Sequence, residues 1–114
     1  MAAKYWLRTE GIEFEVSKTA VPKTDGKTQK IDMVTQLPLW TVEVTAYDTE
    51  NQGAQVMPVV MAAASAPEVR WREQVELVDL EIRPWANNRN NNLSSGVSFH
   101  ASAVHRAKLP AAAA

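Results

Sequence analysis

Hydrophobic and polar residues alternate with a period of two in several segments of the chain. Residues 12–17 (IEFEVS) and residues 40–47 (WTVEVTAY) both follow this pattern. A strand points successive side chains to opposite faces, so the pattern predicts half-buried β-strands. Residues 54–61 (AQVMPVVM) predict a third strand. Pro58 confines it to a sheet edge or a bulge, because proline has no N–H to donate.

Two more strands are predicted in the second half of the chain. Residues 75–82 (VELVDLEI) are rich in aliphatic side chains, but the apolar positions change parity, which predicts a β-bulge near Leu77 and Val78. Residues 97–104 (VSFHASAV) alternate regularly and predict the fifth strand. Residues 62–67 (AAASAP) alone have a composition that favours helix, and they are too few for more than one turn.

Two long polar segments separate these strands. Residues 19–29 (TAVPKTDGKTQ) contain a proline and an Asp-Gly pair, which are typical of turns. Residues 86–96 (ANNRNNNLSSG) hold five asparagines and no acid. Asn and Ser bond their own backbone and favour irregular structure. We therefore predict two loops, the second of them flexible and ordered on binding.

The predicted fold is all-β: a small antiparallel five-stranded barrel with almost no helix. It forms one domain over residues 1–106, followed by a flexible Ala- and Pro-rich tail at residues 107–114. Long loops after the first and fourth strands are typical of the oligonucleotide/oligosaccharide-binding (OB) barrel. In that fold the ligand binds to those two loops and the sheet face between them. A β-sandwich of similar length is also compatible with the pattern.

Charge is unevenly distributed although the net charge is only −1. Residues 18–30 contain four lysines and one acid, and residues 83–114 contain four Lys or Arg residues and no acid, whereas residues 43–81 contain eight acids and two arginines. The basic segments coincide with the two predicted loops, and a local positive field attracts anionic partners. Solubility alone is the other interpretation of this charge.

Several classes of function have no support in the sequence. The chain lacks cysteine, which fits a reducing cytosol, and it lacks a signal-peptide pattern or an apolar run of membrane-spanning length. It has no phosphate-binding glycine loop and no metal-ligand spacing, and neither histidine has a triad-like neighbour. We expect a cytoplasmic, non-enzymatic protein without metal, cofactor or membrane partner.

The tryptophans carry the candidate chemistry. Trp71 lies between two arginines, and Trp85 follows Arg83-Pro84. A ring beside guanidinium groups suits single-stranded nucleic acid, because a base stacks on the ring for about 1–3 kcal/mol while the cations contact phosphates. The alternative is that each ring caps an open end of the barrel. The candidate nucleic-acid-binding residues are Lys23, Lys27, Lys30, Tyr47, Arg70, Trp71, Arg72, Arg83, Trp85, Asn88, Arg89 and His100.

Three segments also resemble a known group of proteins: residues 38–44 (PLWTVEV), residues 83–85 (RPW) and residues 95–104 (SGVSFHASAV). Their order and spacing are similar to those in small proteins of actinobacterial conjugative plasmids and integrative elements. That group is described as regulatory, or as activators of plasmid replication, integration and excision. The resemblance implies an OB-like fold and a role in the DNA metabolism of a mobile element. The chain departs from the group at residues 70–74 and in its asparagine run.

Together these observations predict a non-enzymatic single-stranded nucleic-acid-binding protein, with DNA favoured over RNA, acting in replication or transfer of a plasmid or phage. A homodimer or homotetramer is expected. The alternative is a protein–protein adaptor or regulator that uses the exposed edge of the third strand. A barrel that binds a small molecule or a sugar has only the tryptophans in its favour.

Overall fold

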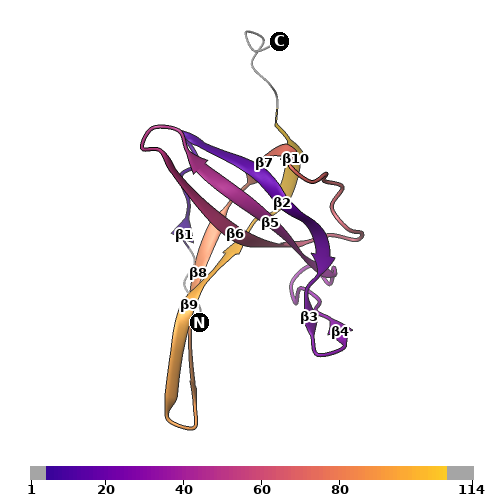
Figure 1. Cartoon of the computed structure of the whole chain (residues 1–114). Helices are drawn as coiled ribbons and strands as arrows, with labels where there is room; N and C mark the ends of the chain where they lie inside the picture. The colour runs from indigo at the N-terminus through magenta and orange to yellow at the C-terminus, as the bar shows by residue number, and fades with distance from the viewer. Residues whose placement is uncertain (1–4, 108–114) are drawn as a thin grey trace.

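The computed structural model describes residues 5–107, and all of their regular structure is β-strand (Figure 1). No helix long and apolar enough to span a bilayer occurs in this range. The expected tail lies outside the described residues, except for Ala107. The strands are β1 (Tyr5–Trp6), β2 (Ile12–Pro22), β3 (Thr24–Asp25), β4 (Thr28–Gln29), β5 (Leu39–Asp48), β6 (Gly53–Ala62), β7 (Gln74–Val78), β8 (Glu81–Arg89), β9 (Asn92–His100) and β10 (Ala103–Arg106).

Eight of the strands form one curled sheet in the order β1-β8-β9-β6-β5-β2-β7-β10, and β3 pairs with β4 as a separate hairpin. Neighbours in the sheet are antiparallel, except that β6 and β9 are parallel where Val59 and Val60 meet Phe99 and His100. The all-β prediction is confirmed. The prediction of a closed five-stranded barrel is wrong, because β1 and β10 end the sheet at opposite sides and leave a half-barrel.

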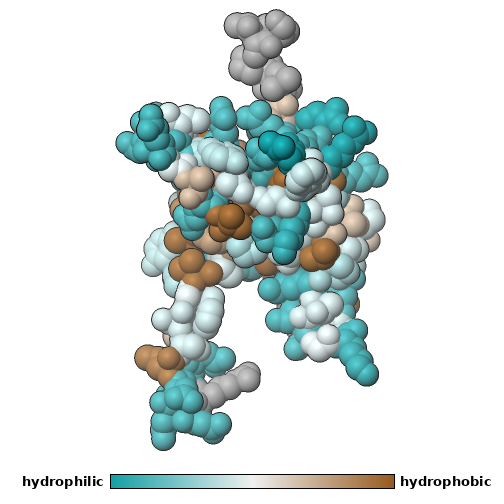
Figure 2. All heavy atoms as spheres, in the orientation of Figure 1, coloured by the Kyte–Doolittle hydropathy of each residue, from teal (hydrophilic) through white to brown (hydrophobic). Residues whose placement is uncertain are grey.

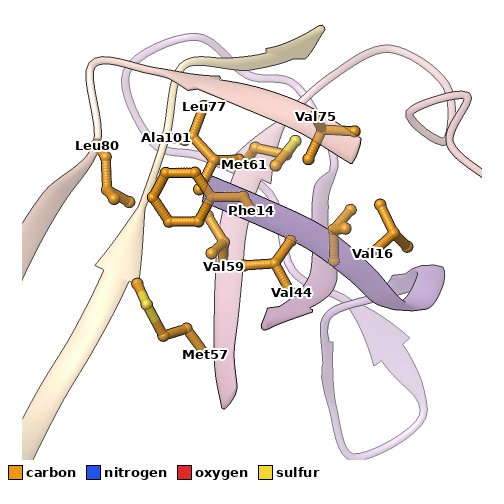
Figure 3. Packing of buried hydrophobic residues seen from close by; sticks show 11 residues of the cluster. Phe14, Val16, Val44, Met57, Val59, Met61, Val75, Leu77, Leu80 and Ala101 are labelled. Atoms are coloured by element: carbon orange, nitrogen blue, oxygen red, sulfur yellow. The ribbon is translucent and has the colours of Figure 1, made fainter. Parts of the chain in front are cut away.

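The concave side of the sheet holds the hydrophobic core (Figure 3). The alternation seen in the sequence is reproduced at the centre of two strands, where Phe14 and Val16 of β2 and Val42 and Val44 of β5 are buried and the residues between them are not. Fully burying an aliphatic or aromatic side chain contributes about 1.5–3 kcal/mol. The core cluster comprises Phe14, Val16, Val42, Val44, Met57, Val59, Met61, Val75, Leu77, Leu80 and Ala101.

A corner divides each of the last two predicted strands into two. The pairs Val78↔Ala103 and Glu81↔His100 leave residues 79–80 opposite residues 101–102, with no ladder pair between them. Asp79 adopts a left-handed backbone conformation with φ of 51°. The change of parity therefore reflects a break after Val78 rather than the expected bulge near Leu77 and Val78.

The corner sends the two halves of one long hairpin to different neighbours. β7 pairs with β2, whereas β9 pairs with β6, so the hairpin contributes to both sides of the half-barrel. Backbone groups at the corner bond to other strands: Leu7 N–H donates to Leu80 O at 2.8 Å, and Ala101 N–H donates to Val60 O at 3.0 Å. Ser102 Oγ lies 3.2 Å from Asp79 Oδ2 across the break.

The asparagine-rich segment is not the loop that composition predicted. β8 and β9 pair without interruption from Glu81↔His100 to Arg89↔Asn92, and the resulting hairpin extends away from the sheet (Figure 1). Asn90 and Asn91 form its two-residue turn with φ values of 52° and 65°. Positive φ at both turn positions matches the twist of a hairpin, and asparagine tolerates it better than most residues.

The first predicted loop is also largely β-structure. β2 continues to Pro22, and β3 and β4 then form a short hairpin around Gly26, which has φ of 70°. The predicted turn at Asp25-Gly26 is therefore confirmed. The prediction that residues 19–29 form an irregular loop around it is wrong, because most of them are in strands. The two hairpins, β3–β4 and β8–β9, extend from the same end of the sheet (Figure 1).

We predict that Asp79→Val lowers the free energy of unfolding by about 1–2 kcal/mol, because a β-branched residue is strained at positive φ. Asp79→Asn should be nearly neutral, since asparagine tolerates this conformation and keeps a side-chain oxygen for Ser102. Urea unfolding of the two variants and the parent checks this. Equal stability of Asp79→Val and the parent would show that the corner does not depend on the conformation of residue 79.

Candidate nucleic-acid interface

The outer part of the β8–β9 hairpin, residues 83–98, is called the arm here. Among residues 5–107, β1 pairs with β8 only up to Ile82, and β6 pairs with β9 only at Phe99 and His100, so no described strand pairs with the outer sides of the arm. Because the ladder is uninterrupted, alternate residues share a face. The polar face carries Arg83, Trp85, Asn87, Asn92, Ser94, Gly96 and Ser98, and the second face carries Pro84, Ala86, Asn88, Leu93, Ser95 and Val97.

Trp85 lies on the polar face over Gly96, its partner in the ladder. A Cβ atom on residue 96 would be 2.9 Å from Trp85 Cζ2, so the indole occupies the space that any other residue would need. The side chain remains 47% exposed. The ring is thus supported on one side by backbone and keeps half of its surface available for stacking.

Arg83 precedes Trp85 on the same face and is partly engaged with Glu81. Its Nε donates to Glu81 Oε1 at 2.9 Å, and its Nη2 donates to the same oxygen. Glu81 is only 5% exposed, and a buried carboxylate requires such a partner. The pair is neutral overall, but a guanidinium has five N–H donors, so Arg83 keeps donors for another acceptor.

A cavity of about 290 Å³ opens at the base of the arm. Arg83 and His100 form one wall, and the turn at residues 32–35 forms another. The corner and the end of β6 complete it. The lining residues are Trp6, Asp32, Thr35, Leu39, Val60, Met61, Ala62, Asp79, Glu81, Arg83, His100, Ala101 and Ser102.

His100, a candidate nucleic-acid-binding residue, is half-buried in this wall. Its Nε2 lies 2.9 Å from Ser98 Oγ. Burial lowers the pKa of His100 from 6.5 to about 4, and the positive charges of Arg83 and Lys23 act in the same direction. The imidazole is therefore neutral near pH 7 and contributes hydrogen bonding rather than charge.

The three candidate lysines, in the first predicted loop or directly after it, lie at the same end of the sheet as the arm (Figure 1). Lys23 follows β2, and its backbone C=O accepts from Lys30 N–H at 2.7 Å, which closes the β3–β4 hairpin. Lys27 lies in the turn of that hairpin and is exposed. Of these three lysines, Lys23 lies close enough to affect the pKa of His100.

Other predicted site residues lie elsewhere. Tyr47 and Arg72 line a second cavity of about 350 Å³, where Arg72 Nε is 3.2 Å from Glu15 Oε1. Trp71 is beside it, with Arg72 Cζ 5.8 Å from the ring centroid. Leu39 and Tyr47 line the first and second cavities from opposite ends of β5, about 26 Å apart at about 3.3 Å per residue.

Three further candidate residues are Arg70 and Asn88, which line neither cavity, and Arg89, beside the turn of the arm. Arg70 is exposed, and its backbone N–H donates to Glu73 Oε1 at 3.1 Å, so its position is fixed by a turn before β7. Asn88 lies on the second face of the arm, opposite to Trp85. The backbone of Arg89 closes the hairpin beside Asn92, but its side chain lies outside the described part of the structure.

Of the residues that line the first cavity, the sequence indicated only Arg83 and His100, and the polar or aromatic residues that it missed include Trp6, Asp32 and Glu81. The available signal was the spacing of Asp32 and Thr35, since Asp32 Oδ2 accepts from Thr35 N at 2.9 Å and Thr35 Oγ1 at 2.8 Å. These bonds lower the pKa of Asp32. Trp6 and Glu81 gave no local signal, because β1 and β8 become neighbours only in the folded sheet.

No family model, curated protein or solved structure matches the chain. The resemblance to proteins of mobile elements therefore stays a prediction. Within residues 5–107 there is no group of three or more His, Asp or Glu side chains arranged to hold a metal ion.

The pKa of His100 predicts a pH dependence of stability. The unfolded chain binds a proton below about pH 6.5 while the folded protein does not until about pH 4, so stability falls as the pH drops through this window. Urea unfolding at about pH 7 and about pH 5 should show the loss. His100→Gln keeps a polar side chain beside Ser98 without titrating and should flatten the dependence. If the free energy of unfolding of His100→Gln still falls as steeply between about pH 7 and about pH 5, the pH dependence belongs to other titrating groups.

The contact of Trp85 with Gly96 predicts that Gly96→Ala lowers the free energy of unfolding by about 1–3 kcal/mol, because the new methyl group displaces the indole. Gly53→Ala is the matched control, since the nearest atom to its added Cβ is 4.0 Å away. Urea unfolding compares them. If the two substitutions lowered the free energy of unfolding equally, the position of the Trp85 indole would not depend on the absence of a side chain at residue 96.

Proposed function

We propose that the chain is a non-enzymatic protein that binds single-stranded nucleic acid, DNA rather than RNA, at the base of the arm. The observation that carries this proposal is the adjacency of Arg83 and Trp85 on one face beside an open cavity. The extension to replication or transfer of a mobile element rests on the sequence resemblance alone.

The proposed contact divides the work between two neighbouring side chains. A base stacks on the exposed half of Trp85, and the guanidinium of Arg83, two residues away and about 7 Å along the strand, contacts the phosphate of the same nucleotide. Stacking is tolerant of sequence because every base has a π-face. The protein should therefore bind single strands of many sequences with only modest preferences among them.

The remaining positive charge comes from the lysines and from Arg89 of the arm. Because Glu81 neutralises Arg83, net attraction for the phosphate backbone depends on Arg89 and on Lys23, Lys27 and Lys30, which lie in the β3–β4 hairpin or beside it. Neutral His100 adds a hydrogen-bonding group in the cavity wall. Affinity should fall with salt by about 0.7 log units per phosphate contacted, for each tenfold rise in salt concentration.

A second candidate, assembly with another protein, is favoured by one specific observation. β9 pairs with β6 only at Val59 and Val60, so among the described residues no strand covers the edge of β6 from Gly53 to Pro58. Val56, on that edge, is 57% exposed. An open edge can accept a partner strand, although Pro58 interrupts its row of N–H donors. Sedimentation of the purified protein tests whether that partner is a second copy.

We predict that Trp85→Ala lowers the affinity for a fluorescent single-stranded oligonucleotide by about 5- to 150-fold, the effect of one lost stacking contact. Trp71→Ala is the matched control. It also removes an exposed tryptophan, 68% exposed, but from beside the second cavity, which two glutamates line. It should leave affinity within about twofold, because phosphates are repelled there.

Anisotropy titrations at two salt concentrations measure both variants. A larger loss in Trp71→Ala than in Trp85→Ala would move the binding site to the second cavity. No binding of the parent protein to any single strand would reject the proposal and leave assembly through the β6 edge as the function to test.

A further inference from the structure

The base of the arm suffices for the proposed single-strand contacts, so the outer part of the arm is not accounted for. Residues 88–93 lie beyond Trp85 and include the turn at Asn90 and Asn91. Figure 1 shows this end of the hairpin far from the sheet. From Arg83 to Asn90 the strand covers about 23 Å at about 3.3 Å per residue.

The composition of this tip is suited to polar contacts with a nucleic acid. It carries four asparagines, and no acid occurs in the sequence from Arg83 to the end of the chain. Asparagine can bond bidentately to adenine at its major-groove edge. Leu93, which is 76% exposed, offers an apolar contact of the kind that a thymine methyl group accepts. Figure 2 shows the arm as largely hydrophilic with separate hydrophobic patches.

The dimensions of the arm fit a duplex groove. Its two strands lie about 5 Å apart, so the ribbon with its side chains is close to the major groove of B-DNA, which is about 12 Å wide and admits a two-stranded ribbon. Since β1 and β6 leave the hairpin at residues 82 and 99, no described strand obstructs the two sides of the ribbon beyond that point. The sharp turn at Asn90 and Asn91 keeps its end narrow.

We infer that the protein recognises junctions between single-stranded and double-stranded DNA: the base of the arm holds the single strand, and residues 88–93 enter the major groove of the adjoining duplex. This inference rests on the proposed function and adds the class of DNA substrate. A second copy packed on the exposed second face of the arm is the competing use of the same residues, and the experiment separates the two.

The test uses three fluorescent DNAs that share one sequence: a single strand of about 15 nucleotides, a blunt duplex of about 12 base pairs, and that duplex carrying the single strand as a tail. The full chain should bind the tailed duplex at least about fivefold more tightly than the single strand, the effect of one bidentate base contact. Equal affinity for the tailed duplex and the single strand would overturn the inference while leaving the proposed function intact.

A shortened arm provides the decisive variant. Hydrogen-bonded and non-hydrogen-bonded residue pairs alternate along an antiparallel ladder. The pair Asn87↔Ser94 lies two steps from Arg89↔Asn92 and is therefore of the same kind, so it can flank the same two-residue turn. Replacing residues 88–93 by Asn-Gly therefore removes the tip and keeps Arg83 and Trp85. This variant also loses Arg89, so it should bind the single strand about as tightly as Arg89→Gln does, and unlike Arg89→Gln it should lose the preference for the tailed duplex.

Two controls assign the loss. Arg89→Gln removes the positive charge of the tip but keeps the full length of the arm. It should lower the affinity for all three DNAs by a similar factor. Sedimentation of the parent and the shortened variant reports on assembly. If shortening converts an oligomer to a monomer and the junction preference is retained, the tip is a contact between copies and the inference is wrong.

The result also separates the inference from the function on which it rests. Binding to the blunt duplex that is lost on shortening, with no binding to the single strand, would reject the proposed function and support groove binding by the tip. Single-strand binding without a preference for the tailed duplex would support the proposed function and overturn the inference that the tip enters a groove. Retention of the preference in the shortened variant would overturn the inference in either case.

Discussion

The fold depends on one interruption of backbone pairing, where Asp79 and Leu80 face Ala101 and Ser102. A single straight hairpin could join only one side of the sheet. At the corner the hairpin changes direction, so that its inner half continues the sheet beside β2 and its outer half reaches β6. The backbone groups freed at the break do not remain unsatisfied, because Leu7 and Val60 take part in hydrogen bonds there. The half-barrel and the direction of the arm thus have the same origin.

The corner also determines the electrostatics at the base of the arm. Immediately after it, Glu81 becomes buried where β8 meets β1 and β9, and Arg83 compensates its charge. Ala101, on the other strand, enters the core while the adjacent His100 lines the cavity. The Arg83–Glu81 pair and the neutral imidazole of His100 therefore add no net charge at this position.

No described strand pairs with the outer sides of the arm, so its support comes from its own ladder and from its base. Isolated two-stranded hairpins are marginal in water. Here the stacking of Trp85 on Gly96 and the asparagine turn both favour the ladder, and the base is anchored in the sheet. Trp71 plays a different part: it lies against Arg72, which pairs with Glu15, and thereby connects the approach to β7 with β2. Two tryptophans with similar sequence surroundings thus have different physical roles.

The sequence by itself determined the period-two strands and the buried faces of β2 and β5, because these follow from side-chain alternation along each strand, and within residues 5–107 it correctly indicated β-structure rather than helix. It also indicated that basic charge accompanies two segments and that Trp85 belongs with Arg83. It could not show that the asparagine run is a paired ribbon, since ladder hydrogen bonds with the facing strand outweigh the local preference of Asn for turns. The separation of Trp71 from Trp85, the burial of Glu81 and the shifted pKa of His100 were decided only by the tertiary structure. Each depends on strands that are distant in sequence becoming neighbours, and local composition contains no information on which strands these are.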